Sequence, residues 1–324
     1  MPDKYFDAVI VGRRTLTDRI AEFQIAAADD RSLPMAEAGT HLELRFGGAD
    51  GRFLRHYSVV GPLTLDPRPE SFWRIAVQHE FRNRGSAFLH THVRRGARLL
   101  VSRPAGAFRL RRNAPHTLLV AGGIGITAIL PMMRSLAVRG RSFSMLYAGT
   151  RRAAMAYADE VTAIGGERVH LHESDRNGLP DLDALLAGQP PGTIVHVCGP
   201  PPMIEALRSR ARVRGWPDER VRFEVFNAAH RPDDTGFTVR LPSGRSVEVG
   251  AGITILDALE AAGVDTLSDC RRGECGLCAT DVLDQHEGID HRDSYLTPEE
   301  KTAATQLTLC CSRARGRLID LDLS

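Results

Sequence analysis

Long hydrophobic runs are missing from this sequence of 324 residues. No apolar stretch approaches the ~20 residues that a membrane-spanning helix needs, so the sequence predicts no membrane association. The first residues lack a basic segment followed by an apolar core. We therefore expect no secretion signal and a cytoplasmic protein.

An excess of one charge is missing as well. The 42 basic and 40 acidic residues leave a formal net charge of +2, which gives no reason to expect a nucleic-acid partner. An apolar content of 43% and a charged content of 25% are ordinary for a folded protein. The length allows two or three domains, and no internal repeat or low-complexity tract divides the chain.

Cysteine is scarce, with six residues, but most of them follow one pattern. Cys270, Cys275 and Cys278 form a C-x4-C-x2-C run, and the pair Cys310 and Cys311 follows. This spacing is typical of a plant-type ferredoxin, which holds a [2Fe–2S] cluster on four thiolates. The fourth ligand must come from a distant segment that closes the cage, so the two later cysteines compete for that role.

A disulfide framework and a zinc site are the alternatives for these cysteines. Disulfides are rare in reducing compartments and fit poorly in a large chain without a secretion signal. Zinc sites usually have paired C-x2-C knuckles at both ends, and only one run is present here. Gly273 and Gly276 instead suit a loop that wraps closely over a cluster, because glycine adopts positive φ and lets N–H groups point at sulfur.

The chain changes its hydrophobic pattern twice. Up to about residue 105, short apolar runs at 6–11, 20–25 and 41–46 lie between turn residues, which predicts a sandwich or barrel. From about residue 110, strands alternate with helices such as 128–138, which predicts a doubly wound parallel sheet. The strands predicted in this second zone are 116–121, 143–147, 169–172, 194–197 and 221–225.

A third zone follows a polar segment at 227–236 that we interpret as a linker. Strands are predicted at 237–241 and 245–249 and a helix at 254–262, the outline of a small β-grasp ferredoxin. The predicted domains are 1–108, 109–228 and 235–324.

Two glycine- or proline-rich turns are candidates for nucleotide binding. Gly122–Thr127 follows a predicted strand and opens a helix, where N–H groups and the helix dipole favour a diphosphate. It does not match G-x-G-x-x-G, so a plain β–α turn is the alternative. Cys198–Met203 follows the predicted strand 194–197 and precedes a helix at the same sheet edge, although Cys198 alone also suits a buried apolar position.

In the first zone, Arg55-His-Tyr-Ser58 combines groups that suit a flavin. Arginine pairs with phosphate, tyrosine stacks on a flat ring, and a serine hydroxyl bonds a ring nitrogen. Arg82–Ser86 adds charge to a Gly-Ser turn suited to a terminal phosphate. Ordinary strand and turn residues are the alternative for both segments.

The chain carries four motifs in order: R-x-Y-S, G-G-I-G-I-T, C-G-P-P-x-M and the cysteine run. In this order they resemble the phthalate dioxygenase reductases and vanillate O-demethylase reductases, which are the class IA reductases of Rieske oxygenases. The resemblance covers essentially the whole chain. It implies an antiparallel β-barrel flavin domain, an α/β parallel-sheet nucleotide domain and a C-terminal β-grasp ferredoxin. It also implies FMN, a [2Fe–2S] cluster and an electron-transfer role in aromatic catabolism.

The resemblance implies that hydride passes from NAD(P)H to the flavin and that single electrons reach a terminal Rieske-type oxygenase through the cluster. A flavin must lie between the two, because the nucleotide delivers two electrons together and the cluster accepts one. The alternatives are an FAD-containing reductase for another acceptor and a redox-sensing iron–sulfur flavoprotein.

Site residues follow from the same resemblance. Ser58, Cys198 and Phe226 are expected beside the reacting rings, with Phe226 covering the flavin. The expected flavin contacts are Arg55, His56, Tyr57, Ser58, Ala76, Val77, Arg82, Arg84, Gly85 and Ser86. The expected nucleotide contacts are Gly122, Gly123, Gly125, Thr127, Arg151, Cys198, Gly199 and Pro200. The expected cluster ligands are Cys270, Cys275, Cys278 and Cys310, the last because it precedes the stretch Cys311-Ser-Arg-Ala.

The sequence departs from the family pattern at two points. Ala128 follows Thr127 where the family has proline, a change of little weight because proline early in a helix is optional. Arg151 and Arg152 stand where NADH-specific sites often carry an acidic residue, and arginine accepts a 2′-phosphate. The family implies NADH, and these arginines leave NADPH possible.

Overall fold

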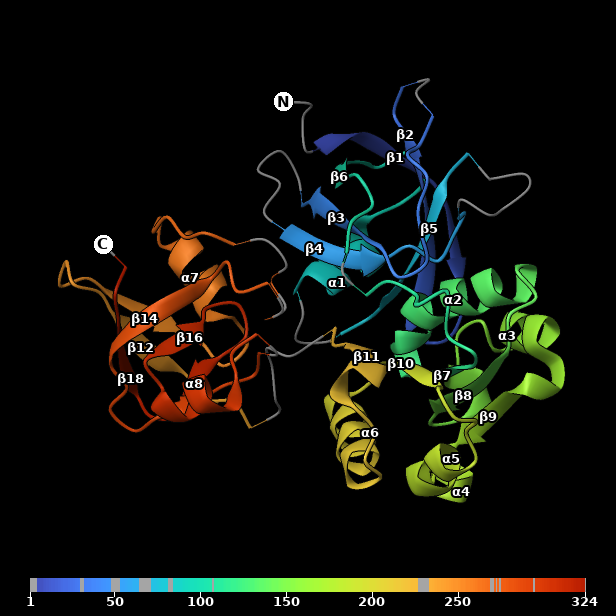
Figure 1. Cartoon of the computed structure of the whole chain (residues 1–324). Coiled ribbons are helices and arrows are strands. Elements are labelled where there is room, and N and C mark those ends of the chain that lie inside the picture. The colour runs from blue at the N-terminus through green and yellow to red at the C-terminus, as the bar shows by residue number, and fades with distance from the viewer. Residues whose placement is uncertain are drawn as a thin grey trace. The chain divides into compact units, whose positions relative to one another are not determined.

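The computed structural model describes residues 5–323, apart from 30–31, 48–52, 64–70, 81–83, 107, 227–232, 269–270, 272, 274 and 294. The chain divides into two compact units, Met1–Glu224 and Val225–Ser324. The first unit contains a barrel and a parallel sheet, and the second contains a smaller mixed sheet (Figure 1). Each unit has its own apolar core.

The barrel is one antiparallel sheet of six strands in the order β4-β3-β6-β1-β2-β5. An isolated bridge between Gly61 and Arg74 joins the chain after β4 to β5 and so links the two end strands. The helix α1 (Arg84–His92) contacts both of these strands. The strands are β1 (Tyr5–Thr15), β2 (Ile20–Ala27), β3 (His41–Phe46), β4 (Phe53–Ser58), β5 (Trp73–Gln78) and β6 (Arg98–Ser102).

This zone agrees with the sequence prediction except at Gly85–Ser86. The predicted turn there is the first turn of α1. The apolar residues that alternate along the strands point inward and form the barrel core. That core includes Phe23, Ile25, Leu42, Leu44, Trp73 and Ile75.

The parallel sheet has the strand order β11-β10-β7-β8-β9, which confirms the predicted doubly wound fold. Strand order reverses between β7 and β10, and ligands of such sheets bind at the carboxyl ends beside this switch point. The strands are β7 (Thr117–Gly122), β8 (Phe143–Gly149), β9 (Val169–Glu173), β10 (Ile194–Cys198) and β11 (Val221–Glu224). The helices are α2 (Ile126–Val138), α3 (Ala158–Gly165), α4 (Ser174–Asn177), α5 (Leu182–Ala187) and α6 (Pro201–Val213), with short 3-10 turns η1 (Gly123–Gly125), η2 (Arg152–Ala154), η3 (Gly166–Arg168) and η4 (Asp218–Arg220).

The second unit is a β-grasp, as predicted, with the order β13-β12-β18-β14-β16. β12 and β18 are parallel, and the other neighbours are antiparallel. The Thr254 hydroxyl caps α7 by accepting the Asp257 N–H at 2.9 Å. The elements are β12 (Phe237–Arg240), β13 (Ser246–Val249), α7 (Ile255–Ala261), β14 (Ala279–Asp284), β15 (Ile289–Asp290), α8 (Pro298–Ala303), β16 (Gln306–Thr308), β17 (Arg313–Ala314) and β18 (Leu318–Leu321).

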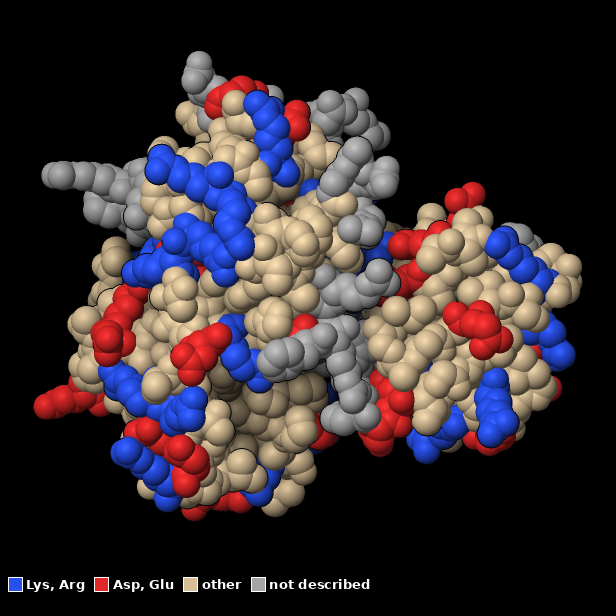
Figure 2. Space-filling view, turned by 180° about the vertical axis from the view of Figure 1, so that it is seen from behind, with Lys and Arg blue, Asp and Glu red and all other residues tan. Residues whose placement is uncertain are grey.

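Most of the predicted linker at 227–236 lies outside the described residues. Every helix that the structure describes is too short or too polar to cross a membrane. On the face in Figure 2, acidic and basic side chains are interspersed on both units, in keeping with the formal net charge of +2.

Candidate functional site

The cysteine loop brings at least two of the predicted cluster ligands together. The thiols of Cys278 and Cys310 are hydrogen-bonded to each other, and this bond lowers the pKa of Cys278 to about 7. The backbone N–H of Gly273 donates to Cys310 Sγ at 3.1 Å. Cys275 is exposed at the rim of the loop, and Cys270 lies outside the described residues. Two adjacent thiols, with a backbone N–H donor aimed at the sulfur of one of them, are surroundings that suit an iron–sulfur cluster.

Both predicted glycine conformations are present in this loop. Gly273 has φ +75° and Gly276 has φ +76°. A Cβ on Gly273 would lie 2.5 Å from Cys311 Sγ, and one on Gly276 would lie 2.2 Å from the Tyr295 ring. Both positions therefore require glycine for their backbone conformation and for the space around them.

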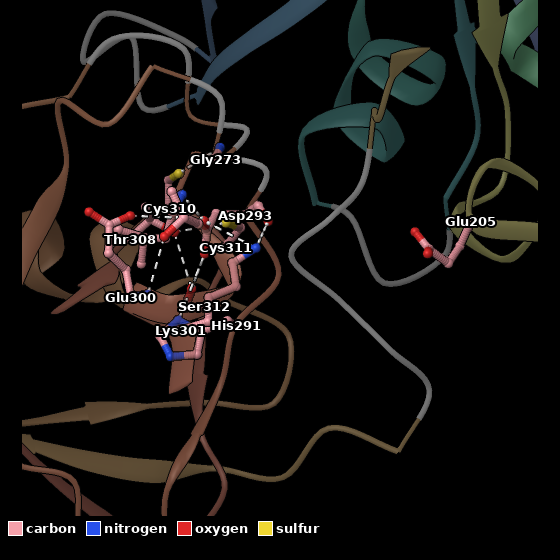
Figure 3. A network of polar contacts seen from close by, with 12 residues as sticks. Glu205, Gly273, His291, Asp293, Glu300, Lys301, Thr308, Cys310, Cys311 and Ser312 are labelled. Carbon is pink, nitrogen blue, oxygen red and sulfur yellow. Dashed lines mark hydrogen bonds and ion pairs between the residues drawn. The ribbon is translucent and has the colours of Figure 1, made fainter. Parts of the chain in front are cut away.

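Cys310 and Cys311 have different surroundings (Figure 3). Cys310 receives the Gly273 N–H from the ligand loop, whereas Cys311 Sγ lies 3.1 Å from the Thr308 hydroxyl. Both are almost fully buried. The Gly273 N–H donor gives Cys310 the surroundings of a cluster ligand, and Cys311 Sγ also lies close to Gly273.

A buried carboxylate behind the loop was not foreseen from the sequence. Asp293 accepts the Leu296 N–H at 2.7 Å and lies 3.6 Å from the Lys301 amine. Ser312 connects Asp293, at 3.5 Å, with Thr308, at 3.1 Å. The network in Figure 3 thus supports the segment that carries Cys310.

The barrel brings Arg55 to the first turn of α1. A Cβ on Gly85 would lie only 2.9 Å from Arg55 Nε, so glycine makes room for the guanidinium. Ser86 is buried in the same turn, and its hydroxyl accepts the Glu80 N–H at 3.0 Å. A guanidinium beside the N–H groups of a helix N-terminus is suited to a phosphate. Arg82 and the side chain of Arg84 lie outside the described residues.

The alternation of β4 separates the residues of the R-x-Y-S motif. Tyr57 is opposite Leu42 and Arg55 is opposite Leu44, on the side of the barrel core. Burial raises the pKa of Tyr57, so its ring keeps the phenolic proton. His56 is on the other side, 3.9 Å from the Glu43 carboxylate, and is not brought together with Arg55. Ser58 ends the strand, where the chain leaves the sheet.

The predicted contacts on β5, Ala76 and Val77, are both buried. The carbonyl of Val77 lies 2.9 Å from His90 Nε2 of α1. This contact ties β5 to the helix whose first turn contains Gly85 and Ser86.

The two β–α turns meet at the switch point of the parallel sheet. A Cβ on Gly122 would lie 2.6 Å from Pro200 Cδ, and one on Gly125 would lie 2.1 Å from the Cys198 carbonyl oxygen. The structure thus brings these predicted nucleotide residues together, and a Cβ on Gly199 would lie 3.0 Å from Gly122 Cα. Because the two turns approach so closely, there is no room for a side chain at Gly122 or Gly125.

The other residues predicted to bind the nucleotide differ in burial and in the space around them. Gly123 has φ +53° and open space where a side chain would be. The Thr127 hydroxyl is buried and donates to the Ile124 carbonyl at 3.0 Å. Cys198 is fully buried at the end of β10. Phe226 is half-buried, two residues beyond β11.

Carboxylates surround the two arginines after β8. Arg151 Nη2 lies 3.5 Å from Asp18, and Arg152 Nη2 lies 2.5 Å from Asp159. The backbone N–H of Arg152 donates to the Glu173 carboxylate at 2.8 Å. Both guanidiniums therefore already have acidic partners.

Two family descriptions match parts of the chain. Residues 239–315 match the 2Fe-2S iron-sulfur cluster binding domain, which places a [2Fe–2S] cluster in the second unit. Residues 99–221 match the N-terminal domain of proteins like dimethylamine monooxygenase subunit DmmA.

Relatives match this chain over almost its whole length. The chain is 35% identical over 330 residues to the vanillate O-demethylase oxidoreductase of Pseudomonas sp., covering 98% of this chain and 99% of that one. It is 38% identical over 319 residues to the heme-dependent oxidative N-demethylase beta subunit of Ectopseudomonas mendocina, covering 98% of each. The solved structure of phthalate dioxygenase reductase, described as modular for electron transfer from pyridine nucleotides to [2Fe–2S], superposes with a TM-score of 0.79 at 32% identity, covering 98% of each chain.

Proposed function

The chain belongs to the phthalate dioxygenase reductase and vanillate O-demethylase reductase family, and from this premise we propose that it binds FMN, oxidises NADH and reduces a Rieske-type terminal oxygenase. It is an NAD(P)H-dependent reductase that carries a flavin and a [2Fe–2S] cluster. When bound, the flavin takes up two electrons as a hydride and releases them singly, and the cluster carries one electron at a time.

The observation that carries this proposal is the meeting of the Gly122–Thr127 and Cys198–Pro200 turns beside the barrel of the same unit. The turns offer backbone N–H groups for the diphosphate of the nucleotide. Open space at Gly123 leaves room for it, and Cys198 lies at the carboxyl end of the neighbouring strand β10. Ser58 would present a hydroxyl to the flavin ring, and Phe226 would cover it.

The phosphate site supports FMN as the flavin. Arg55 and the first turn of α1, with Gly85 and Ser86, form a compact cationic site suited to a terminal phosphate. The bulkier diphosphate of FAD would have to continue past this turn. In the second unit, Cys270, Cys275, Cys278 and Cys310 would hold the cluster, and the Gly273 N–H would bond a ligand sulfur.

The acidic surroundings of Arg151 and Arg152 support NADH as the donor. A 2′-phosphate would compete with Asp18 and Asp159 for these exposed arginines and would approach Glu173 as well. Placing like charges together opposes NADPH, whereas the ribose hydroxyls of NADH suit carboxylates.

The acceptor has a second candidate. The relative from Ectopseudomonas mendocina is named as a subunit of a heme-dependent demethylase, so a heme oxygenase is the alternative to a Rieske-type one. Both would accept single electrons from the cluster. The two are separated by mixing the reduced protein with a purified oxygenase of each kind and following oxygenase reduction optically.

Anaerobic stopped-flow mixing with NADH tests the proposal. We expect flavin absorbance to bleach first and cluster absorbance to follow, and mass spectrometry of the released flavin should give FMN. A protein whose flavin stays oxidised under excess NADH and NADPH would refute the reductase function. Release of FAD would refute the flavin assignment alone.

A further inference from the structure

We infer that Arg134 is a positioning residue for hydride transfer, and that Arg134, Glu160 and Arg74 together fix the helix behind the nucleotide loop against the strand end that carries Ser58. The inference rests on the proposed placement of the flavin and the nicotinamide. None of the three side chains needs to touch the reacting rings. Their role is to set the distance between the two halves of the first unit.

Arg134 links the two sheets of this unit directly. It lies on α2, its Nη1 donates to the Val60 carbonyl at 2.9 Å, and its Nη2 pairs with Glu160 of α3. Its side chain is only 15% exposed. One guanidinium thus connects two helices of the parallel sheet with the chain that follows β4.

Arg74 meets the same carboxylate from the barrel side. Its Nη1 lies 4.0 Å from Glu160 Oε2 and 3.9 Å from Glu22 Oε2, and its backbone N–H donates to the Gly61 carbonyl at 2.6 Å. A Cβ on Gly61 would lie 2.8 Å from Arg134 Nη1 and 3.0 Å from Arg74 Nη2. Glycine at position 61 therefore allows both guanidiniums to reach the strand end.

Glu22 extends the contact deeper into the interface. Its side chain is 1% exposed, and it accepts the Tyr157 hydroxyl at 2.9 Å and Arg14 Nη2 at 3.1 Å. Tyr157 precedes α3 with φ +58°, a conformation that is costly for a bulky residue. The interface thus holds Tyr157 in a strained conformation that orients its hydroxyl toward the barrel.

The position of this network relative to the candidate site indicates what it does. Val60, which receives Arg134, is two residues after Ser58, and α2 begins where the Gly122–Thr127 loop ends. Arg134 is about two helical turns from that loop. Hydride transfer needs reacting atoms about 3–3.5 Å apart, and a misplacement of about 1 Å costs on the order of a hundredfold in rate. A link between the nucleotide loop and the strand that carries Ser58 therefore affects the rate of hydride transfer more than it affects the affinity for the nucleotide.

The test is Arg134→Met in the full-length protein, with flavin and iron counted for each preparation. Anaerobic stopped-flow mixing with NADH gives the limiting rate of flavin reduction and the apparent Kd as separate quantities. We expect the limiting rate per bound flavin to fall at least about tenfold, while the Kd changes less than about twofold. With NADH deuterated at the transferred position, the isotope effect should persist or increase in the variant. Arg134→Lys, which keeps the charge and one donor, should recover part of the rate.

The matched control is Arg210→Met. Its ion pair with Asp183, at 2.8 Å, lies wholly within the parallel-sheet part, so its loss should leave the limiting rate unchanged. If Arg134→Met fails to fold or to retain flavin, Glu160→Gln is measured by the same criterion, since it keeps the shape of the side chain and removes its charge.

A limiting rate per flavin that is unchanged in the folded variant, even with a lowered melting temperature, would overturn the inference and leave a structural role only. Failure of the wild type to be reduced by either nucleotide would instead refute the proposed function. Because Arg134, Arg74 and Glu160 form one network, the double variant Arg134→Met/Glu160→Gln should lose less rate than the product of the two single losses. Full additivity would also overturn it.

Discussion

At the scale of single residues, adjacent cysteines can differ in role because the backbone aims their side chains at different partners. Cys310 Sγ accepts the Gly273 N–H, and Cys311 Sγ contacts Thr308. We predict that Cys310→Ser abolishes the [2Fe–2S] absorption and EPR signals, while Cys311→Ser retains both with unchanged iron content. Cys311→Ser is the matched control, since it changes the same atom one position away. The opposite outcome would mean that the ligand assignment is wrong.

Arg151 and Arg152 give a second prediction at this scale. If they bound a 2′-phosphate, each charge-assisted contact would be worth about 1.5–3 kcal/mol, or roughly ten- to hundredfold in affinity. Because Asp18 and Asp159 already pair with them, we expect the wild type to prefer NADH. We expect Arg151→Ala/Arg152→Ala to change the ratio of kcat/KM values for NADH and NADPH by less than about threefold. A wild-type preference for NADPH that collapses in the double variant would contradict this prediction.

At the scale of elements, the nucleotide site depends on two turns that touch through backbone. A Cβ on Gly125 would lie 2.1 Å from the Cys198 carbonyl oxygen, so Gly125→Ala must push the turns apart. Overpacking of this kind costs about 1–3 kcal/mol. We therefore predict a lower melting temperature and a kcat/KM for NADH reduced at least about tenfold, measured with ferricyanide as acceptor.

Gly188→Ala is the control for that substitution. Gly188 follows α5 with φ −79°, and its added Cβ would meet its nearest atom at 3.6 Å, an ordinary contact. The variant should keep full activity and unfold at the same or a slightly higher temperature. Equal activity in Gly125→Ala would show that the close approach of the two turns is not needed.

The sequence predicts elements well where one periodicity dominates. The strands over 143–147 and 194–197 are mostly apolar runs, and both are largely buried strands of the parallel sheet. The helix α1 was missed because the sequence around Gly85 has the composition of a turn, and helix formation there depends on packing against β4 and β5. The Arg134 to Val60 bond joins residues 74 positions apart. Hydrophobic periodicity predicts which face of an element is buried, but not which distant residue contacts that face. Contacts of this kind are therefore identified only from the structure.

The same limit applies to the site. The cysteine spacing indicates the cluster because the ligands are mostly local, and the glycine turns indicate the nucleotide edge because strand ends meet there. Asp293 could not be identified, since nothing in its sequence neighbourhood distinguishes a buried carboxylate from an exposed one. Its partners Lys301 and Ser312 become apparent only when β15, α8 and the segment after β16 are assembled.

At the scale of the whole molecule, each unit completes its own sheet, so the cluster unit should be separable from the reductase unit. β11 closes the parallel sheet at Glu224, and the β-grasp begins at Phe237 and ends on β18, which pairs with β12. We predict that a protein of residues 1–235 folds, binds flavin and oxidises NADH with ferricyanide at close to the full-length rate.

The truncated protein should nevertheless reduce cytochrome c at least about tenfold more slowly than the full chain, because the one-electron exit through the cluster is gone. A full-length Cys310→Ser protein serves as the control, since it lacks the cluster but keeps the second unit. If both variants lose cytochrome c activity to the same extent, the cluster itself is the exit. If the truncated protein reduces cytochrome c as fast as the full chain, electrons leave directly from the flavin, and the second unit serves another acceptor.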